Sequence, residues 1–250
     1  MSAFPARRWH TAPLARGLGK GRSRVGPIEL LFDLVYVFTV IQLSYVLMGN
    51  LSWRGAAETA VLFAAVWWAW NYTAWAMNWL DPDRAPVWGF NAGLMIAGLG
   101  MSLAIPKAFG NAALLFAVCY AVAQIARPVF MMAAFRGTEL GVCYGALLGW
   151  SVLSAVFWIA GAFASPEWRL LIWALALAID YIGPWLDYRL PFVGSAPMEK
   201  WDTDAEHLTE RNQLVYIIAL GETILMMGFT LSRMEALTTT AMIASAVSDR

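Results

Sequence analysis

The chain has 250 residues, of which 60% are hydrophobic and only 14% are charged, and its formal net charge is zero. Soluble domains usually carry about 25% charged residues, so this composition excludes an ordinary soluble enzyme or binding module. A mean hydropathy of +0.58 and 14 Trp residues, a type enriched at membrane interfaces, indicate a membrane protein.

Residues 1–27 form a basic amino-terminal arm that contains no acidic residue. Its low hydrophobicity and its Gly and Pro residues predict disorder. It lacks an apolar core followed by a cleavage site, so we do not interpret it as a cleaved signal peptide. Next to a membrane span, basic residues are better explained as a topology signal than as a nucleic-acid-binding tail.

Apolar runs of roughly 20 residues follow the arm, which is the length that crosses a hydrocarbon core. The expected spans are 28–48, 58–79, 87–105, 112–133, 139–162, 168–189 and 209–231, with an eighth beginning near Leu237. The predicted fold is all-α, a polytopic transmembrane helical bundle of about seven spans plus a partial eighth, over residues 28–231. Residues 232–250 are then either the start of a further helix or a truncated end.

Lys and Arg are distributed unevenly between the two predicted sides of the membrane. If the amino terminus is inside, eleven of these residues lie on the inner side and four on the outer side. Loops rich in Lys and Arg stay in the cytoplasm. We therefore expect a cytoplasmic amino terminus.

Ionisable side chains inside the predicted spans are the main functional signal. Glu29 and Asp33 lie four residues apart, and therefore on one face of the first helix. Asp180 falls near the middle of the sixth span, and Arg211 and Glu222 share one stripe of the seventh. Each of these side chains would cost kilocalories per mole if it faced lipid. We therefore expect them to face the interior of the bundle.

Further polar residues fall at a similar depth in the inner half of the bundle. They are Asn71, Gln124, Arg127 and Glu210. The sequence thus predicts a polar cluster that lines a cavity open to the cytoplasm. Glu222 lies about 16 Å deeper than Arg211, from eleven residues at 1.5 Å each, which makes it the best candidate for a proton-carrying group. The candidate residues for binding a proton, ion or substrate are Asp33, Asp180, Arg211, Glu222, Glu29, Glu210, Asn71 and Arg127.

Structural alternatives exist for several of these residues. Glu29 could lie only at the interface, where an acid at a helix start suits the helix dipole. Asn71 and Asn78 could hydrogen-bond between helices. His207 is better explained as a helix-start residue than as a metal ligand. A buried ion-pair network that only fixes the fold also remains open.

Three stretches of the sequence, VGPIELLFDLVYVFTVIQLS, LALAIDYIGP and HLTERNQLVYIIALGETIL, resemble the best-marked blocks of the bacterial low temperature requirement protein A (LtrA) family, in the same order. The resemblance covers residues 24–231 and implies a multi-pass protein of the bacterial inner membrane. It implies no substrate, and members usually continue through further helices. The motif positions that it marks are Glu29, Asp33, Asp180, His207, Glu210, Arg211, Gly221 and Glu222.

Three classes of function fit these observations. We favour a proton-linked transporter or channel, because carboxylates converge and Pro184 predicts a broken sixth helix of the kind that lines solute sites. The second class is a membrane-embedded enzyme on a lipid or lipid-linked substrate, with paired carboxylates as acid and base, although no catalytic residue can be assigned. The third is a receptor-like bundle with a small ligand.

Cofactors and partners follow from what the motifs lack and from the membrane location. The chain has two His residues, one of them in the arm, and no nucleotide-binding or nucleophile motif. We therefore expect no metal and no cofactor. The expected partners are membrane lipids and an unidentified small solute or ion, and no nucleic acid.

Overall fold

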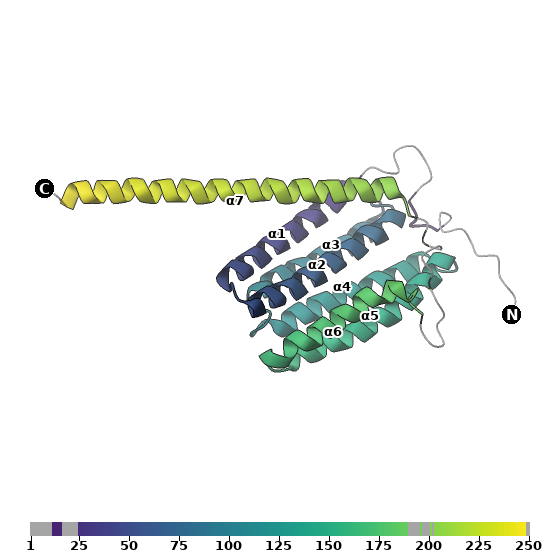
Figure 1. The fold of residues 1–250 in the computed structure, drawn as a ribbon. Helices are drawn as coiled ribbons and strands as arrows, with labels where there is room; N and C mark the ends of the chain where they lie inside the picture. The colour runs from purple at the N-terminus through teal and green to yellow at the C-terminus, as the bar shows by residue number, and fades with distance from the viewer. Residues whose placement is uncertain (1–11, 17–24, 190–195, 197–200, 202, 249–250) are drawn as a thin grey trace.

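The computed structural model describes residues 12–16, 25–189, 196, 201 and 203–248. Within these ranges the chain forms seven α-helices and one 3-10 turn (Figure 1). They are α1 (Pro27–Gly49), α2 (Trp53–Trp79), α3 (Ala85–Ala104), η2 (Ile105–Lys107), α4 (Ala113–Ala134), α5 (Glu139–Phe163), α6 (Pro166–Trp185) and α7 (Ala205–Ser248).

Most helices begin at a local signal in the sequence. Pro27 and Pro166 occupy the first positions of α1 and α6, where the missing amide hydrogen of proline costs no hydrogen bond. The Ser52 hydroxyl accepts a hydrogen bond from the Gly55 amide at 3.0 Å and caps α2. Thr138 caps α5 through the Gly141 amide at 3.2 Å.

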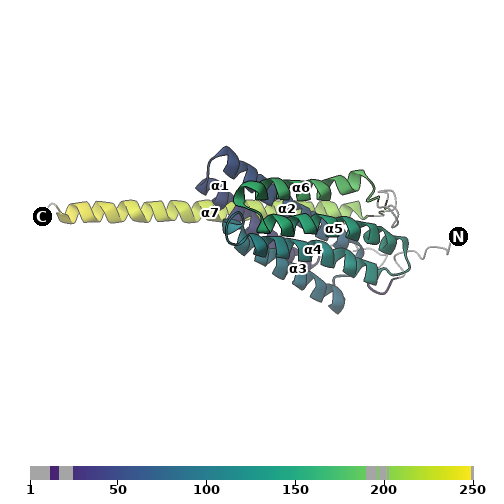
Figure 2. The same ribbon diagram turned by 90° about the horizontal axis from the view of Figure 1, so that it is seen from below.

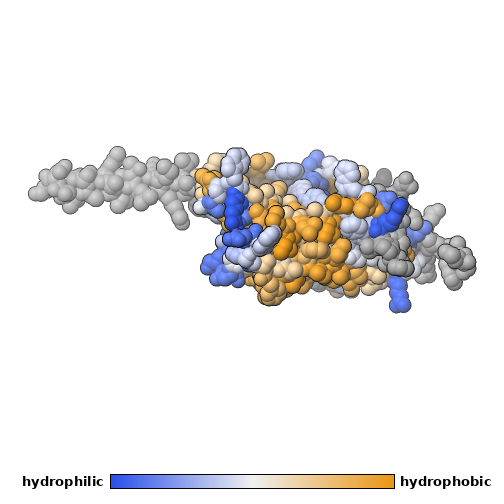
Figure 3. Space-filling model, turned by 60° about the horizontal axis from the view of Figure 1, so that its bottom comes forward, coloured by the Kyte–Doolittle hydropathy of each residue, from blue (hydrophilic) through white to orange (hydrophobic). Residues whose placement is uncertain are grey.

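Helices α1 to α6 lie side by side as an up-and-down bundle, so α1 begins and α4 ends at the same end of the bundle (Figures 1 and 2). We call this end the α1-start end. Two buried apolar clusters fill the interior. Exposed apolar side chains cover the middle of the surface, with hydrophilic residues toward its ends (Figure 3). An apolar belt of this kind suits a surface that faces lipid.

Four helical segments in the described ranges are long and apolar enough to cross a membrane. They are Pro27–Gly49, Ala85–Lys107, Ala113–Ala134 and Glu139–Phe163. The prediction of an all-helical fold with membrane-spanning character is therefore confirmed, whereas a count of seven spans plus a partial eighth is not supported. The Trp-rich sequence of α2 and the charged residues of α6 and α7 make these helices less apolar.

The prediction of a new span near Leu237 is wrong, because α7 continues without a break from Ala205 to Ser248. Its 44 residues extend over about 66 Å at 1.5 Å per residue, roughly twice the thickness of a hydrocarbon core. Figure 1 shows α7 projecting beyond the ends of the other helices. The expectation of a sixth helix broken at Pro184 is also wrong, because α6 is continuous and ends one residue later, at Trp185.

Part of the amino-terminal arm lies against the bundle. The Arg16 amide donates to the Trp79 carbonyl at 2.8 Å, and the Asp81 amide donates to the Leu14 carbonyl at 3.0 Å. These hydrogen bonds fasten residues 12–16 to the end of α2. The other arm residues before Val25 lie outside the described ranges, so their predicted disorder stays a prediction.

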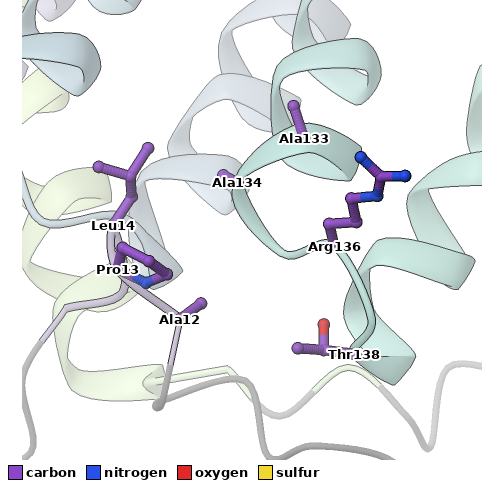
Figure 4. A pocket seen from close by; sticks show the side chains of 7 residues that line it. All are labelled: Ala12, Pro13, Leu14, Ala133, Ala134, Arg136 and Thr138. Atoms are coloured by element: carbon purple, nitrogen blue, oxygen red, sulfur yellow. The ribbon is translucent and has the colours of Figure 1, made fainter.

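A hollow of about 370 Å³ lies between this segment and the turn that joins α4 to α5 (Figure 4). Its lining residues are Ala12, Pro13, Leu14, Ala133, Ala134, Arg136 and Thr138.

Candidate functional site

A buried polar cluster lies at the α1-start end, where the arm, α1, α2 and α7 meet. We call it the Glu29 cluster, and its members are Arg16, Glu29, Asp33, Trp70, Asn78, His207 and Arg211. The side chains of Glu29, Asp33, His207 and Arg211 have no exposed surface. They therefore do not line the open cavity that the sequence analysis expects.

Asp33 forms an ion pair with Arg211. One guanidinium nitrogen of Arg211 donates to Asp33 Oδ1 at 2.5 Å, and Trp70 Nε1 donates to the same oxygen at 2.7 Å. The Arg211 guanidinium also lies over the rings of Phe32 and Trp70, at 5.8 and 5.7 Å from their centroids. Asp33 Oδ2 is buried and accepts no hydrogen bond from the part of the chain that the structure describes.

Glu29 accepts hydrogen bonds on one carboxylate oxygen, while the other lies near two side-chain nitrogens without accepting a hydrogen bond from the described residues. Oε2 accepts from the Gly26 amide at 2.8 Å and from Arg16 Nη2 at 3.2 Å. Oε1 lies 3.2 Å from His207 Nε2 and 3.8 Å from Arg211 Nη1. The bond to the Gly26 amide is the helix-capping role that the sequence allows. Glu29 also forms ion pairs and is fully buried, so helix capping is only part of its surroundings.

Asn78 and Asp204 hold His207 in place. The Asn78 amide nitrogen lies 3.3 Å from His207 Nδ1 and 3.0 Å from the Asp204 carbonyl oxygen. The Asp204 amide donates to Asn78 Oδ1 at 2.7 Å. His207 is thus a helix-start residue, as the sequence favours, but it is also a buried member of the cluster.

A second buried network connects α4 with α6, and we call it the Arg127 chain. Arg127 Nη1 donates to Gln124 Oε1 at 2.8 Å, Gln124 Nε2 donates to the Tyr120 hydroxyl at 2.9 Å, and Tyr120 donates to Asp180 Oδ2 at 2.8 Å. Trp158 Nε1 lies 3.4 Å from the same oxygen. The chain carries polar groups about 10 Å along α4, which is seven residues of helix.

An aromatic cluster closes the bundle beyond the Arg127 chain. The rings of Tyr120 and Trp158 lie 4.7 Å apart, and Trp158 lies 5.2 Å from Trp173. Phe109 and Phe116 pack against Trp173 at 5.1 and 5.6 Å. The buried polar groups at the α1-start end are therefore separated from the opposite end by aromatic side chains packed at tilted and edge-to-face angles.

The two networks approach each other between α2 and α4. Arg127 Nη2 donates to the Ala69 carbonyl at 3.2 Å, one residue before Trp70 of the Glu29 cluster. The single cluster of the sequence analysis is therefore two networks in contact, of which the Glu29 cluster holds two carboxylates and the Arg127 chain holds one.

Three predicted site residues lie outside both networks. Asn71, Glu210 and Glu222 are half-buried, and none of their side chains forms a hydrogen bond or ion pair with another described residue. Near Glu222, α7 and α1 form an apolar groove of about 460 Å³. Its lining residues are Ile41, Ser44, Tyr45, Met48, Thr223, Met226 and Met227.

The sequence analysis did not select several residues of these networks as site candidates. The spacing of Tyr120, Gln124 and Arg127, four and then three residues apart, places them on one face of a helix and could have identified the chain. His207 precedes Arg211 by four residues and gave the same signal. The sequence gives no such signal for Arg16, because a basic residue in a polar arm does not indicate which part of the bundle it contacts.

Comparison with known proteins gives two findings. A family model described as bacterial low temperature requirement A protein (LtrA) matches residues 24–248. The chain is 42% identical over 210 residues to the uncharacterized protein RA0937 of Rhizobium meliloti (strain 1021). That match covers 83% of this chain and 51% of the relative, so the chain spans about half the length of the curated relative that it matches. No solved structure matches.

Proposed function

The chain belongs to the bacterial low temperature requirement A family, and from this premise we propose that it is a proton-linked transporter or channel of the bacterial inner membrane, with its amino terminus in the cytoplasm. The proposed cargo is a small solute or ion. Asp33 is the proposed proton-binding group, and Arg211 is its counter-charge.

The observation that carries the proposal is the unequal surroundings of the two oxygens of Asp33. Both donors, from Trp70 and Arg211, act on Oδ1, while Oδ2 is buried without a described partner. A proton on Oδ2 therefore displaces no hydrogen bond. An ionisable group buried within a membrane span is a functional candidate by default, because lipid-facing placement is costly.

Protonation of Asp33 would also alter the contact between two helices. The Asp33–Arg211 pair joins α1 to α7, and a buried pair that loses one charge leaves the other uncompensated. Proton binding would thus weaken the attachment of α7 to the bundle. A change of this kind links proton uptake to helix movement, which proton-coupled transport requires.

Asp180 of α6 supplies a second carboxylate next to the aromatic cluster, where it accepts from Tyr120, which lies about 10 Å along α4 from Arg127. Its position supports a path that begins at the α1-start end and stops at Trp158. In this proposal the aromatic cluster separates the two sides of the membrane until the helices move.

The test uses the full protein in sealed liposomes with an internal pH dye and an imposed proton gradient. Wild type should dissipate the gradient, and Asp33→Asn should lose at least nine-tenths of that flux. Asp83→Asn is the matched control, because Asp83 is exposed in the turn between α2 and α3. The proposal fails if folded wild type gives no proton flux with any solute gradient, or if Asp33→Asn keeps full flux.

A further inference from the structure

We infer that Asn78 fixes the tautomer of His207 with the ring proton on Nε2, the nitrogen beside Glu29, and that His207, Arg16 and Arg211 together keep Glu29 as a permanent anion, which leaves Asp33 as the proton-binding member of the carboxylate pair. His207 and Asn78 are thereby positioning residues for the site. The second half of this inference rests on the proposed function, whereas the tautomer does not.

The orientation of the Asn78 amide follows from two backbone groups of Asp204. The Asp204 amide can only donate, and it lies 2.7 Å from one terminal atom of Asn78. The Asp204 carbonyl can only accept, and it lies 3.0 Å from the other. The first atom must therefore be the Asn78 oxygen and the second the nitrogen, because the reverse would pair two donors and two acceptors.

The Asn78 nitrogen then acts on the histidine. It lies 3.3 Å from His207 Nδ1 and, carrying only hydrogens, must donate to it. Nδ1 must accept, so the ring proton of the neutral imidazole lies on Nε2. Nε2 faces Glu29 Oε1 at 3.2 Å.

Glu29 lies among more positive charge than Asp33 does. Its Oε2 accepts from the Gly26 amide and from Arg16, whereas its Oε1 accepts no hydrogen bond from the described residues but lies 3.2 Å from His207 Nε2 and 3.8 Å from Arg211 Nη1. Two guanidinium groups therefore lie within 4 Å of Glu29 and one within 4 Å of Asp33, and nearby positive charge favours the ionised carboxylate. The proton is therefore bound at Asp33 rather than at Glu29.

The tautomer is measured first, by nitrogen-15 NMR of the histidine rings in the liposome-embedded protein. His10→Gln leaves His207 as the sole histidine, because the sequence contains two. The expected spectrum shows one protonated nitrogen, Nε2, and one unprotonated nitrogen, Nδ1. A proton on Nδ1, with or without one on Nε2, would overturn the inference.

Asn78→Asp tests the role of Asn78 directly. It replaces the donor facing Nδ1 by an acceptor, so a proton should appear on Nδ1, while Asn71→Asp on the same helix should leave the ring unchanged. Among the described residues, Glu29 faces the His207 ring, Arg16 and Arg211 contact Glu29 in turn, and the Asp204 carboxylate accepts from the His207 amide. An unchanged tautomer in folded Asn78→Asp would contradict the assignment.

Infrared spectroscopy then separates the two carboxylates without relying on transport. The pH-dependent band of a protonated carboxyl group should be lost in Asp33→Asn and kept in Glu29→Gln. The opposite result would overturn the assignment of the proton. If the tautomer and this band agree with expectation while liposomes show no flux, the proposed function fails and the inference about the site stands.

His207→Gln provides a conservative rescue, because its side-chain amide can still donate toward Glu29, whereas His207→Leu cannot. Proton flux should be within about threefold of wild type in the first variant and fall at least tenfold in the second. Equal flux in both variants would show that the donor to Glu29 has no role.

Discussion

At the scale of single residues, the two carboxylates of α1 differ in the charges around them. Glu29 and Asp33 are one helical turn apart and are both fully buried. Each has one oxygen that accepts no hydrogen bond from the described residues, but Glu29 lies within 4 Å of Arg16 and Arg211, whereas Asp33 pairs with Arg211 alone. Two acids that look equivalent in the sequence thus have different chemistry in the fold.

Replacing Arg211 alone should lower the free energy of unfolding more than replacing Arg211 and Asp33 together. Arg211→Gln leaves Asp33 without its counter-charge, and removal of one member of a buried pair typically costs about 3–5 kcal/mol. Adding Asp33→Asn to the Arg211→Gln variant removes the unpaired carboxylate and should restore more than half of the lost free energy of unfolding. Thermal unfolding of the single and double variants in detergent would measure the coupling. Purely additive effects would show that the two side chains do not interact.

The sequence could predict most members of the site but not their pairing. Helical spacing placed Glu29, Asp33 and Arg211 on inward faces, and all three meet in the structure. It did not distinguish Asn71, which is half-buried, from Asn78, which is in the cluster. Both lie on the same face of α2, and the difference comes from where the Asp204 segment crosses that face.

At the scale of helices, α5 and α6 approach each other closely at a glycine. A Cβ atom at Gly161 would lie 2.5 Å from Trp173 Cδ1 and 2.7 Å from Trp173 Nε1. Trp173 is fully buried and donates to the Trp158 carbonyl at 2.9 Å, so its ring cannot move aside without breaking that bond. The absence of a side chain at position 161 therefore sets the spacing of these two helices.

Gly161→Ala should destabilise the protein by about 1–3 kcal/mol, which is the usual cost of overpacking a core. Gly93→Ala is the matched control, because a Cβ added there meets no described atom within 4 Å apart from its chain neighbours and the nearby backbone of its own helix. This control should be neutral or stabilise by up to about 1 kcal/mol, because alanine favours helix more than glycine does. Thermal unfolding of both variants tests the difference, and equal melting temperatures would contradict the packing argument.

Helix positions were predictable because start signals and apolar length are local. The predicted span 139–162 differs little from α5, which begins at the Thr138 cap. The end of α7 was not predictable in this way. The predicted spans left a break between residue 231 and Leu237, but a helix without glycine or proline there can continue through polar sequence.

At the scale of the whole molecule, the arm completes the bundle at the α1-start end. Arg16 bonds both Glu29 and the Leu80 carbonyl at 3.2 Å, and its side chain is 7% exposed. It thereby joins a segment outside the bundle to α1 and α2. The family and the membrane character could be predicted from sequence, but this long-range contact could not, because no local pattern encodes it.

Arg16→Ala should lower stability by about 2 kcal/mol, since hydrogen bonds to charged, buried groups contribute about 1.5–3 kcal/mol. Arg84→Ala is the control, because the Arg84–Asp81 pair lies on the surface and such pairs contribute about 0–1 kcal/mol. The comparison is made by thermal unfolding in detergent. A loss for Arg84→Ala as large as that for Arg16→Ala would show that the Arg16 contact adds no stability.

The length of α7 has a mechanical consequence. From Arg211 to Ser248 the helix extends about 55 Å, at 1.5 Å per residue. If the pivot lies at the Asp33–Arg211 pair, a tilt of about 5° there displaces the far end by about 5 Å, close to one helical turn. A tilt of α7 at the Asp33–Arg211 pair that is too small to rearrange the bundle is therefore amplified into a larger displacement at Ser248.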